Sequence, residues 1–211
     1  MSWPRPSRYV VACAILFAFV SLLMLSGISD ALDVRILEVA GTLRNPGLTR
    51  FMQFSSNVGD WMWEVPFMLL VGVALRIRGR ASTGFWFFGV CVSAEIINAL
   101  LKLLFHRARP TVISHLGLAG SFSFPSGHSL LAPVIWGLGL VLVSQLIDVR
   151  SSRIVLWTIA IALTCTIALS RIYLGVHYAT DVIGGVFFGL GWVLLWWERV
   201  NQQVSVDPAK T

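Results

Sequence analysis

Six long apolar stretches, separated by short polar segments, constrain this chain more than any other feature. They cover Tyr9–Ile28, Trp61–Leu75, Phe85–Leu104, Leu130–Ile147, Ile154–Leu169 and Val182–Trp197. A hydrocarbon core of about 30 Å is crossed by about 20 apolar residues in a helix, whose backbone groups are satisfied internally. With 56% hydrophobic and 12% charged residues, the chain is also too apolar for an ordinary soluble domain. The pattern predicts an all-α, polytopic membrane protein in which residues 1–211 form one domain with six transmembrane helices.

The first apolar run could instead be a cleaved signal peptide. It is longer than the usual apolar core of a signal, and no clear small-x-small cleavage site follows it. We therefore interpret it as a transmembrane helix.

Residues 30–60 differ from the rest because they are polar and mixed in charge. Val34, Leu37 and Leu43 alternate with Arg35 and Glu38 at helical spacing. This pattern predicts an amphipathic helix lying on the membrane surface between the first two spans, broken at Asn45-Pro46-Gly47. A solvated loop is the alternative.

The formal net charge of +6 does not form the continuous basic face typical of a nucleic-acid-binding protein. Instead, basic residues gather in alternate connections, which places the N- and C-termini in the cytoplasm by the positive-inside rule. The residues on that side are Arg5, Arg8, Arg76, Arg78, Arg80, Arg150, Arg153, Arg199 and Lys210. The expected location is the inner or plasma membrane of a cell.

Four further cations lie in the loops on the opposite, periplasmic or extracellular face, against the usual bias. They are Lys102, Arg107, Arg109 and Arg171. The topology brings them to the same face as Ser126-Gly127-His128, which begins the fourth span. Free N–H groups and the positive dipole end at such a helix start bind anions. Lys102, Arg109, Arg171, Ser126 and Gly127 therefore form a candidate phosphate site.

Two histidines accompany this site. His177 and Asp181 are four residues apart, so in a helix the carboxylate can orient the imidazole. His177 could then attack phosphorus as a nucleophile while His128 protonates the leaving oxygen. We expect no metal and no cofactor, because Asp181 is the one carboxylate in these segments and the surrounding cations would repel a metal ion.

The same residues resemble the three-part signature of type 2 phosphatidic acid phosphatases. It consists of Lys102, six residues and Arg109-Pro110, then Pro125-Ser126-Gly127-His128, then Ser170-Arg171, five residues, His177, three residues and Asp181. The resemblance covers residues 102–181 and implies His177 as nucleophile, Asp181 as its orienting group and His128 as general acid. It also implies Lys102, Arg109, Arg171, Ser126 and Gly127 as phosphate ligands. Attack by His177, as inferred above from the residues, would give a phosphohistidine intermediate.

Within that family, the short loops resemble bacterial phosphatidylglycerophosphate and undecaprenyl pyrophosphate phosphatases. The expected partners are the bilayer and a lipid phosphate or lipid pyrophosphate; phosphatidate is a third substrate to consider. A lipid A phosphatase, or a phosphotransferase that uses a lipid pyrophosphate donor, would carry the same signature. A transporter that binds a lipid phosphate without cleaving it is an alternative from another class.

Two residues stay outside the predicted site. Arg107 is interpreted as a solvated loop arginine, although it could reach a substrate phosphate. Glu95 lies roughly on the Lys102 face of its helix, where it could line the lipid pocket or be a hydrogen-bonded core carboxyl. The sequence does not indicate an oligomeric state.

Overall fold

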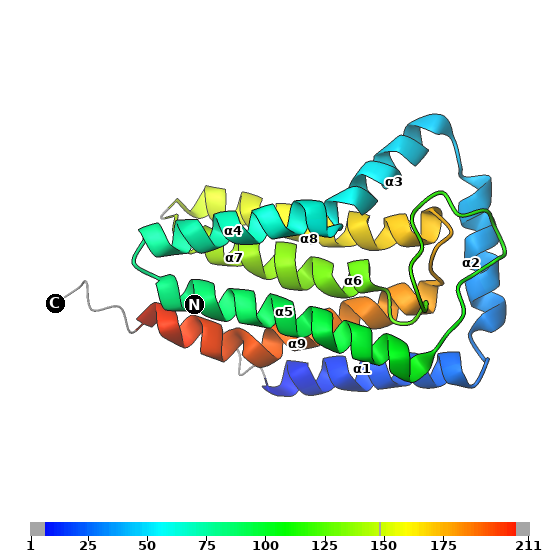
Figure 1. The fold of residues 1–211 in the computed structure, drawn as a ribbon, viewed down its shortest axis with the longest axis horizontal. Coiled ribbons are helices and arrows are strands. Elements are labelled where there is room, and N and C mark those ends of the chain that lie inside the picture. Colours follow the sequence, from blue (N-terminus) through cyan, green and yellow to red (C-terminus); the bar gives the residue numbers. More distant parts are fainter. Residues whose placement is uncertain (1–6, 148, 206–211) are drawn as a thin grey trace.

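The computed structural model describes residues 7–147 and 149–205, and within these ranges the regular structure is entirely helical (Figure 1). The elements are α1 (Ser7–Leu25), α2 (Asp30–Thr42), α3 (Pro46–Val58), α4 (Trp61–Ile77), α5 (Ala81–Phe105), α6 (Gly127–Ala132), η1 (Pro133–Gly137), α7 (Leu138–Ser144), α8 (Arg150–Tyr173) and α9 (Ala179–Ser205). The prediction of an all-α membrane protein is confirmed.

Within the described residues, five helical segments are long and apolar enough to cross a bilayer on their own. They are Arg8–Leu25, Ala81–Phe105, Gly127–Ser144, Arg150–Tyr173 and Ala179–Trp197. The second predicted span corresponds to α4, which has only 17 residues, and α3 precedes it across a bend of 52° at Gly59-Asp60. Six spans therefore result when this bent pair counts as one.

The fourth span contains a π-helical segment that the sequence pattern did not predict. It begins at Pro133, which has no N–H to donate to the preceding turn. Single π-helical turns inside α-helices are rare and are often found at functional sites. The span runs without a break from α6 through η1 to α7.

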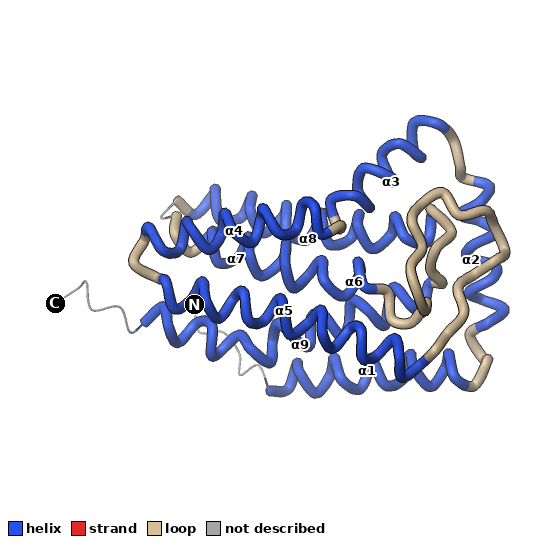
Figure 2. The backbone as a smooth tube through the Cα atoms, in the orientation of Figure 1, coloured by secondary structure: helices blue, strands red, loops and turns tan. Residues whose placement is uncertain are grey.

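The polar segment between the first two spans forms two helices, α2 and α3. Asn45 caps α3 by accepting a hydrogen bond of 2.9 Å from the Leu48 amide, and Pro46 occupies the first turn. The predicted break at Asn45-Pro46-Gly47 is confirmed. α2 runs across the end of the helix bundle beside the long α5–α6 loop, as Figure 2 shows.

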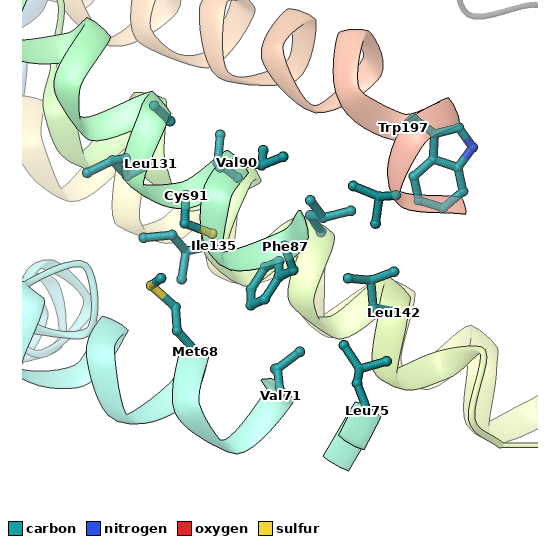
Figure 3. Close-up of a cluster of buried hydrophobic side chains, with 14 of the residues drawn as sticks. Met68, Val71, Leu75, Phe87, Val90, Cys91, Leu131, Ile135, Leu142 and Trp197 are labelled. Carbon is teal, nitrogen blue, oxygen red and sulfur yellow. The ribbon is translucent and has the colours of Figure 1, made fainter. Parts of the chain in front are cut away.

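The hydrophobic core lies among α4, α5, the α6–α7 span and α9 (Figure 3). Close contact between α6 and α9 depends on two glycines. A Cβ at Gly189 would come within 2.2 Å of the Leu130 carbonyl oxygen, and one at Gly185 within 2.6 Å of the Ser126 carbonyl oxygen. The Ser126 amide in turn donates to the carbonyl of Asp181 at 3.0 Å. The start of α6 is thereby held against the start of α9.

The two sets of connections lie at opposite ends of the bundle. The α4–α5 turn, the α7–α8 connection and the end of α9 share one end, whereas α2, the 106–126 loop and the 174–178 turn share the other (Figure 1). This separation matches the predicted grouping of basic connections. Arg5 and Lys210 lie outside the described residues, and the cytoplasmic placement of that end stays a prediction.

Candidate active site

A cavity of about 500 Å³ opens at the end of the bundle that carries α2 and the long loop. Six of the eight residues predicted for the site line it: Lys102, Arg109, Gly127, His128, Arg171 and His177. The other two, Asp181 and Ser126, are fully buried beside it. From these polar groups the cavity continues between α4 and α5 toward the middle of the helix bundle, as far as Met68, Phe88 and Cys91. This direction is called "down" below.

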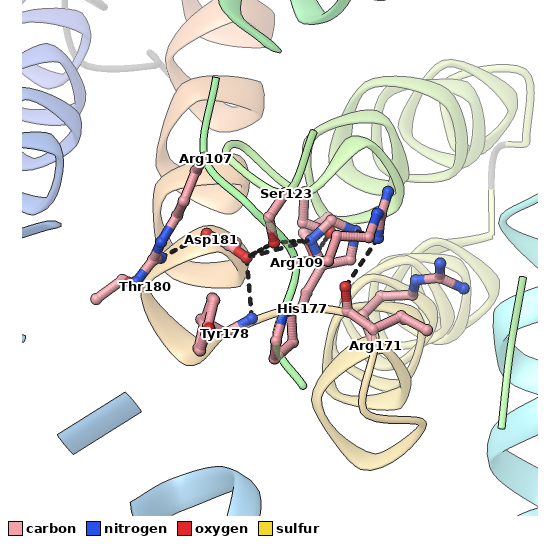
Figure 4. Close-up of polar contacts among 12 residues, drawn as sticks. Arg107, Arg109, Ser123, Arg171, His177, Tyr178, Thr180 and Asp181 are labelled. Carbon is pink, nitrogen blue, oxygen red and sulfur yellow. Dashed lines mark hydrogen bonds and ion pairs between the residues drawn. The ribbon is translucent and has the colours of Figure 1, made fainter. Parts of the chain in front are cut away.

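His177 follows a tight turn at Gly175, which adopts a φ of +77° that favours glycine. Its Nδ1 lies 3.3 Å from Asp181 Oδ2, and its Nε2 lies 3.1 Å from Arg109 Nη1 (Figure 4). Burial lowers the pKa of His177 to about 3, against the attraction of Asp181. The ring is therefore neutral, and since Arg109 Nη1 can only donate, the hydrogen sits on Nδ1 and a lone pair on Nε2.

Asp181 is fixed by more contacts than the i,i+4 spacing implied. Its Oδ2 accepts a hydrogen bond from the Tyr178 amide at 2.9 Å and another from the Ser123 hydroxyl. Its Oδ1 lies 2.6 Å from Arg107 Nη1. Three partners besides His177 thus hold the carboxylate behind the imidazole.

Arg107 is not a solvated loop residue, and that part of the sequence interpretation was wrong. Its side chain is only 11% exposed and joins Asp181 to Asp33, whose Oδ2 lies 2.8 Å from Arg107 Nη2. Nη1 also donates to Thr180 Oγ1 at 2.7 Å. Burial opposes its charge, but Asp181 and Asp33 together raise the pKa of Arg107. Its guanidinium lies 4.1 Å from the centre of the Tyr178 ring. The sequence placed Arg107 in a loop and contained no sign that α2 would cover it.

Asp33 anchors this network from the surface helix. It is 1% exposed, and it accepts from the Thr180 amide at 3.0 Å and from the Thr180 hydroxyl at 2.5 Å. α2 is therefore fastened directly to the first turn of α9, which carries Asp181. Nothing in the alternation of apolar and polar residues of α2 marked Asp33 as part of the site.

The three cations of the cavity are held mainly by backbone carbonyls. Lys102 Nζ donates to Phe122 O at 2.6 Å, Arg109 Nη1 to Val176 O at 2.8 Å and Arg171 Nη2 to Leu118 O at 3.0 Å. Within the described residues no ion pair joins any of them to a carboxylate, and Arg171 Nε has no hydrogen-bond partner. Burial lowers the pKa of Arg109, and a guanidinium in a protein stays charged at neutral pH. This unneutralised charge suits an anionic group such as phosphate.

The start of α6 supplies the remaining predicted residues. Ser126 is the N-cap, and its hydroxyl accepts from Ser129 at 2.9 Å. A Cβ at Gly127 would come within 2.9 Å of Asn98 Nδ2, so this position is packed for glycine. The amides of Gly127 and His128 lie in the first turn, where N–H groups have no intrahelical acceptor.

His128 faces an acidic neighbour that the sequence interpretation missed. Its Nε2 lies 3.1 Å from Oδ1 of Asp60, at the bend between α3 and α4. This contact with His128 lowers the pKa of Asp60, which is therefore charged. Asp60 was read as part of a surface segment, and only the 52° bend turns it toward the cavity.

The described residues include no group of three or more His, Cys, Asp or Glu side chains placed to hold a metal ion. The site instead combines a neutral imidazole, a second histidine and three cations. Such a set can bind a phosphate group, stabilise charge on its oxygens and present one ring nitrogen to phosphorus.

Comparison with known proteins agrees with this chemistry. The sequence model of the PAP2 superfamily matches residues 83–205. Phosphatidylglycerophosphatase B of Bacillus subtilis is 30% identical over 159 residues, 75% of this chain and 78% of that protein. Lipid A 1-phosphatase of Rhizobium etli is 30% identical over 185 residues, 74% of this chain and 73% of that protein.

A solved membrane phosphatase structure shares the fold. The crystal structure of a transmembrane PAP2 type phosphatidylglycerolphosphate phosphatase from Bacillus subtilis aligns with a TM-score of 0.84 at 24% identity. The alignment covers 95% of this chain and 98% of that one. This structure confirms the fold, and the PAP2 model match and the 30% identical relatives confirm the resemblance drawn from the sequence signature.

Proposed function

This chain belongs to the PAP2 superfamily and is a multi-pass membrane lipid phosphatase, and from that premise we propose that it hydrolyses a lipid phosphomonoester through a phosphohistidine intermediate. The observation that carries the mechanism is His177, whose unprotonated Nε2 faces the cavity with Asp181 behind the ring and Arg109 in front. A neutral, oriented imidazole among fixed cations is what nucleophilic attack on phosphate requires.

The reaction proceeds in two displacements. In the first, His177 Nε2 forms a bond to phosphorus while the ester P–O bond breaks, and His128 gives its proton to the departing lipid oxygen. In the second, water attacks the phosphohistidine, His128 takes the proton of that water, and the P–N bond breaks to release inorganic phosphate. Arg109, Arg171 and Lys102 stabilise the equatorial phosphate oxygens in both steps.

Arg109 must change partner during this cycle. In the free protein its Nη1 donates to His177 Nε2 at 3.1 Å, which occupies the lone pair needed for attack. A bound phosphate offers Arg109 a charged acceptor and so draws the guanidinium away from the ring. Substrate binding would then release the nucleophile.

The shape of the cavity supports entry of the lipid from the side. Its lower part, between α4 and α5, is lined by apolar residues that include Val65, Phe88 and Val92. A second, more polar cavity of about 430 Å³ meets it at Asp60 and Arg171. The lipid chain would enter between the two helices, and phosphate would leave through the polar opening.

Among substrates, phosphatidylglycerophosphate is favoured by the similarity to phosphatidylglycerophosphatase B. Undecaprenyl pyrophosphate and phosphatidate are the other substrates that this site would accept. The distribution of basic residues supports an active site on the periplasmic or extracellular face of the inner or plasma membrane, with both termini cytoplasmic. Metal ions take no part in the proposed cycle.

The similarity to lipid A 1-phosphatase supports a second substrate class. A lipid A phosphatase would release inorganic phosphate from lipid A, whereas a phosphotransferase would move phosphate from a lipid pyrophosphate to lipid A. Chromatography of lipid products after incubation with a labelled donor separates these two outcomes.

The central test is phosphate release by purified protein from phosphatidylglycerophosphate, phosphatidate, undecaprenyl pyrophosphate and lipid A. We expect His177→Ala to abolish both phosphate release and the acid-labile labelling of the protein by a substrate with a radioactive phosphate, while the protein elutes as the wild type does on size exclusion. His115→Ala, which removes an exposed histidine, serves as the matched control. Full activity in His177→Ala would disprove the nucleophile, and lipid binding without any phosphate release would favour a transporter.

A further inference from the structure

The catalytic cavity contains a layer of polar groups that the proposed two-step mechanism does not use. Glu64 on α4 and Asn98 on α5 both line it, although their side chains are only 6% and 5% exposed. Glu64 Oε1 and Asn98 Oδ1 have no hydrogen-bond partner among the described residues. A buried acceptor without a partner is destabilising, so such a pair facing a cavity indicates a place for a ligand's hydrogen-bond donor.

Helical spacing fixes the depth of this layer. Glu64 lies one turn below Asp60, whose carbonyl accepts from the Glu64 amide at 3.1 Å, and Asn98 lies one turn below Lys102. Asp60 contacts His128, and Lys102 belongs to the phosphate site. Glu64 and Asn98 therefore lie about 5 Å below the phosphate level, which is one helical turn.

Apolar residues line the cavity one to two turns further down. Met68 follows Glu64 by four residues, Cys91 precedes Asn98 by seven, and Ile135 lies below His128 on the fourth span. From the mouth inward, the wall thus changes from cations and histidines, through carboxyl and amide oxygens that include Glu95 three residues below Asn98, to hydrocarbon. The matching ligand has an anionic end, then a hydrogen-bond donor about 5 Å away, and then an alkyl chain.

The position of His128 shows which part of the substrate meets this layer. An in-line attack by His177 puts the leaving oxygen on the far side of phosphorus, next to His128. The group attached to that oxygen then passes Glu64 and Asn98. Asn98 also packs against Gly127, within 2.9 Å of where a Cβ would stand, so it lies directly beneath the phosphate site.

We propose that Glu64 and Asn98 form a hydroxyl-binding subsite for the leaving group. The preferred substrate is then a lipid phosphomonoester with a free hydroxyl beside the ester oxygen, as on the phosphate-bearing glycerol of phosphatidylglycerophosphate. A carboxyl group hydrogen-bonds a hydroxyl in either protonation state. A second phosphate, as in a lipid pyrophosphate, would place acceptor oxygens against these unpartnered acceptors. This inference rests on the proposed lipid phosphatase activity and narrows its substrate class.

Two substrates that differ by one hydroxyl test the proposal. One is phosphatidylglycerophosphate, and the other is the analogue with propane-1,3-diol in place of the phosphate-bearing glycerol. We expect the wild type to favour the hydroxylated substrate by about tenfold or more in kcat/KM, because sites built to bind a hydroxyl reject analogues that lack it. Glu64→Leu should bring this ratio to within about twofold by losing activity mainly on the hydroxylated substrate.

Glu38→Leu is the matched control, since Glu38 is an exposed acid on α2 outside the cavity, and it should keep the wild-type ratio. Equal rates on the two substrates in the wild type, or an equal loss on both in Glu64→Leu, would overturn the subsite while leaving the phosphatase function intact. Release from neither substrate would overturn the proposed function and the subsite with it. If Glu64→Leu does not fold, Asn98→Leu replaces it in the same comparison. If neither variant folds, the ratio of the wild-type kcat/KM values on the two substrates decides.

Discussion

Replacing Arg107 with glutamine should lower both the stability and the turnover of this protein. The side chain joins Asp33 on α2 to Asp181 on α9, at 2.8 and 2.6 Å, and both carboxylates are buried. Glutamine keeps the approximate length but loses the charge and the forked geometry that bridges the two acids. The substitution therefore separates the surface helix from the catalytic aspartate.

The size of the effect follows from what each carboxylate retains. Breaking a buried ion pair by removing one partner costs about 3–5 kcal/mol. Asp33 keeps two hydrogen bonds from Thr180, and Asp181 keeps those from Tyr178 and Ser123. We therefore expect the lower end, about 3 kcal/mol of unfolding free energy. Turnover should fall by about tenfold to a hundredfold, because a small displacement of Asp181 misorients the His177 ring.

A double-mutant cycle with Asp33→Asn measures the link directly. Arg107→Gln, Asp33→Asn and the double variant are compared in thermal unfolding and in steady-state phosphate release, with Arg50→Gln as the control because Arg50 is an exposed arginine on α3. We expect a coupling of about 1.5–3 kcal/mol in stability. In kinetics, kcat should fall with little change in KM, since Arg107 contacts Asp181 and is absent from the cavity wall.

Additive effects of the two substitutions would refute the network. So would an Arg107→Gln variant whose kcat and unfolding midpoint match those of Arg50→Gln. A rise in KM with unchanged kcat would instead mean that Arg107 binds the substrate phosphate, which the sequence left open.

Three further outcomes are expected. Activity should persist in excess EDTA and be blocked by vanadate, a mimic of five-coordinate phosphorus; loss of phosphate release on chelation would contradict the metal-free mechanism. The pKa of His177 is about 3 in the folded protein and about 6.5 in an unfolded chain, so between these values the unfolded state binds more protons. The unfolding free energy should therefore fall as pH drops below about 6.5, and His177→Asn should flatten that slope in thermal unfolding from pH 7.5 to 4.5. Gly189→Ala should lower the unfolding free energy by about 1–3 kcal/mol, because the added Cβ would lie 2.2 Å from the Leu130 carbonyl oxygen. The control Gly72→Ala should unfold like the wild type, because its added Cβ would have no atom within 4 Å.

The sequence by itself determined the membrane class, the helical fold and the three segments of the site. Long apolar runs admit few structures in lipid, because every backbone group must be paired inside its own segment. Alternation of spans then brought Lys102, His128 and His177 to one face without any tertiary information. The break before Pro46 was also readable, since proline and an Asn cap act within a single turn.

Only the tertiary structure decided which charges support the site. The sequence indicated an exposed loop arginine at Arg107, whereas in the structure α2 covers it. Asp33 accepts a hydrogen bond from the amide of Thr180, which is 147 residues away in the sequence. Asp60 reaches His128 through a bend between two helices, and Glu64 and Asn98 share a layer because α4 and α5 run in opposite directions. Local sequence patterns cannot encode such pairings, because each pairing depends on how elements distant in the chain pack against one another. The family signature, in turn, marks the residues that contact phosphate and not the residues that hold them in place.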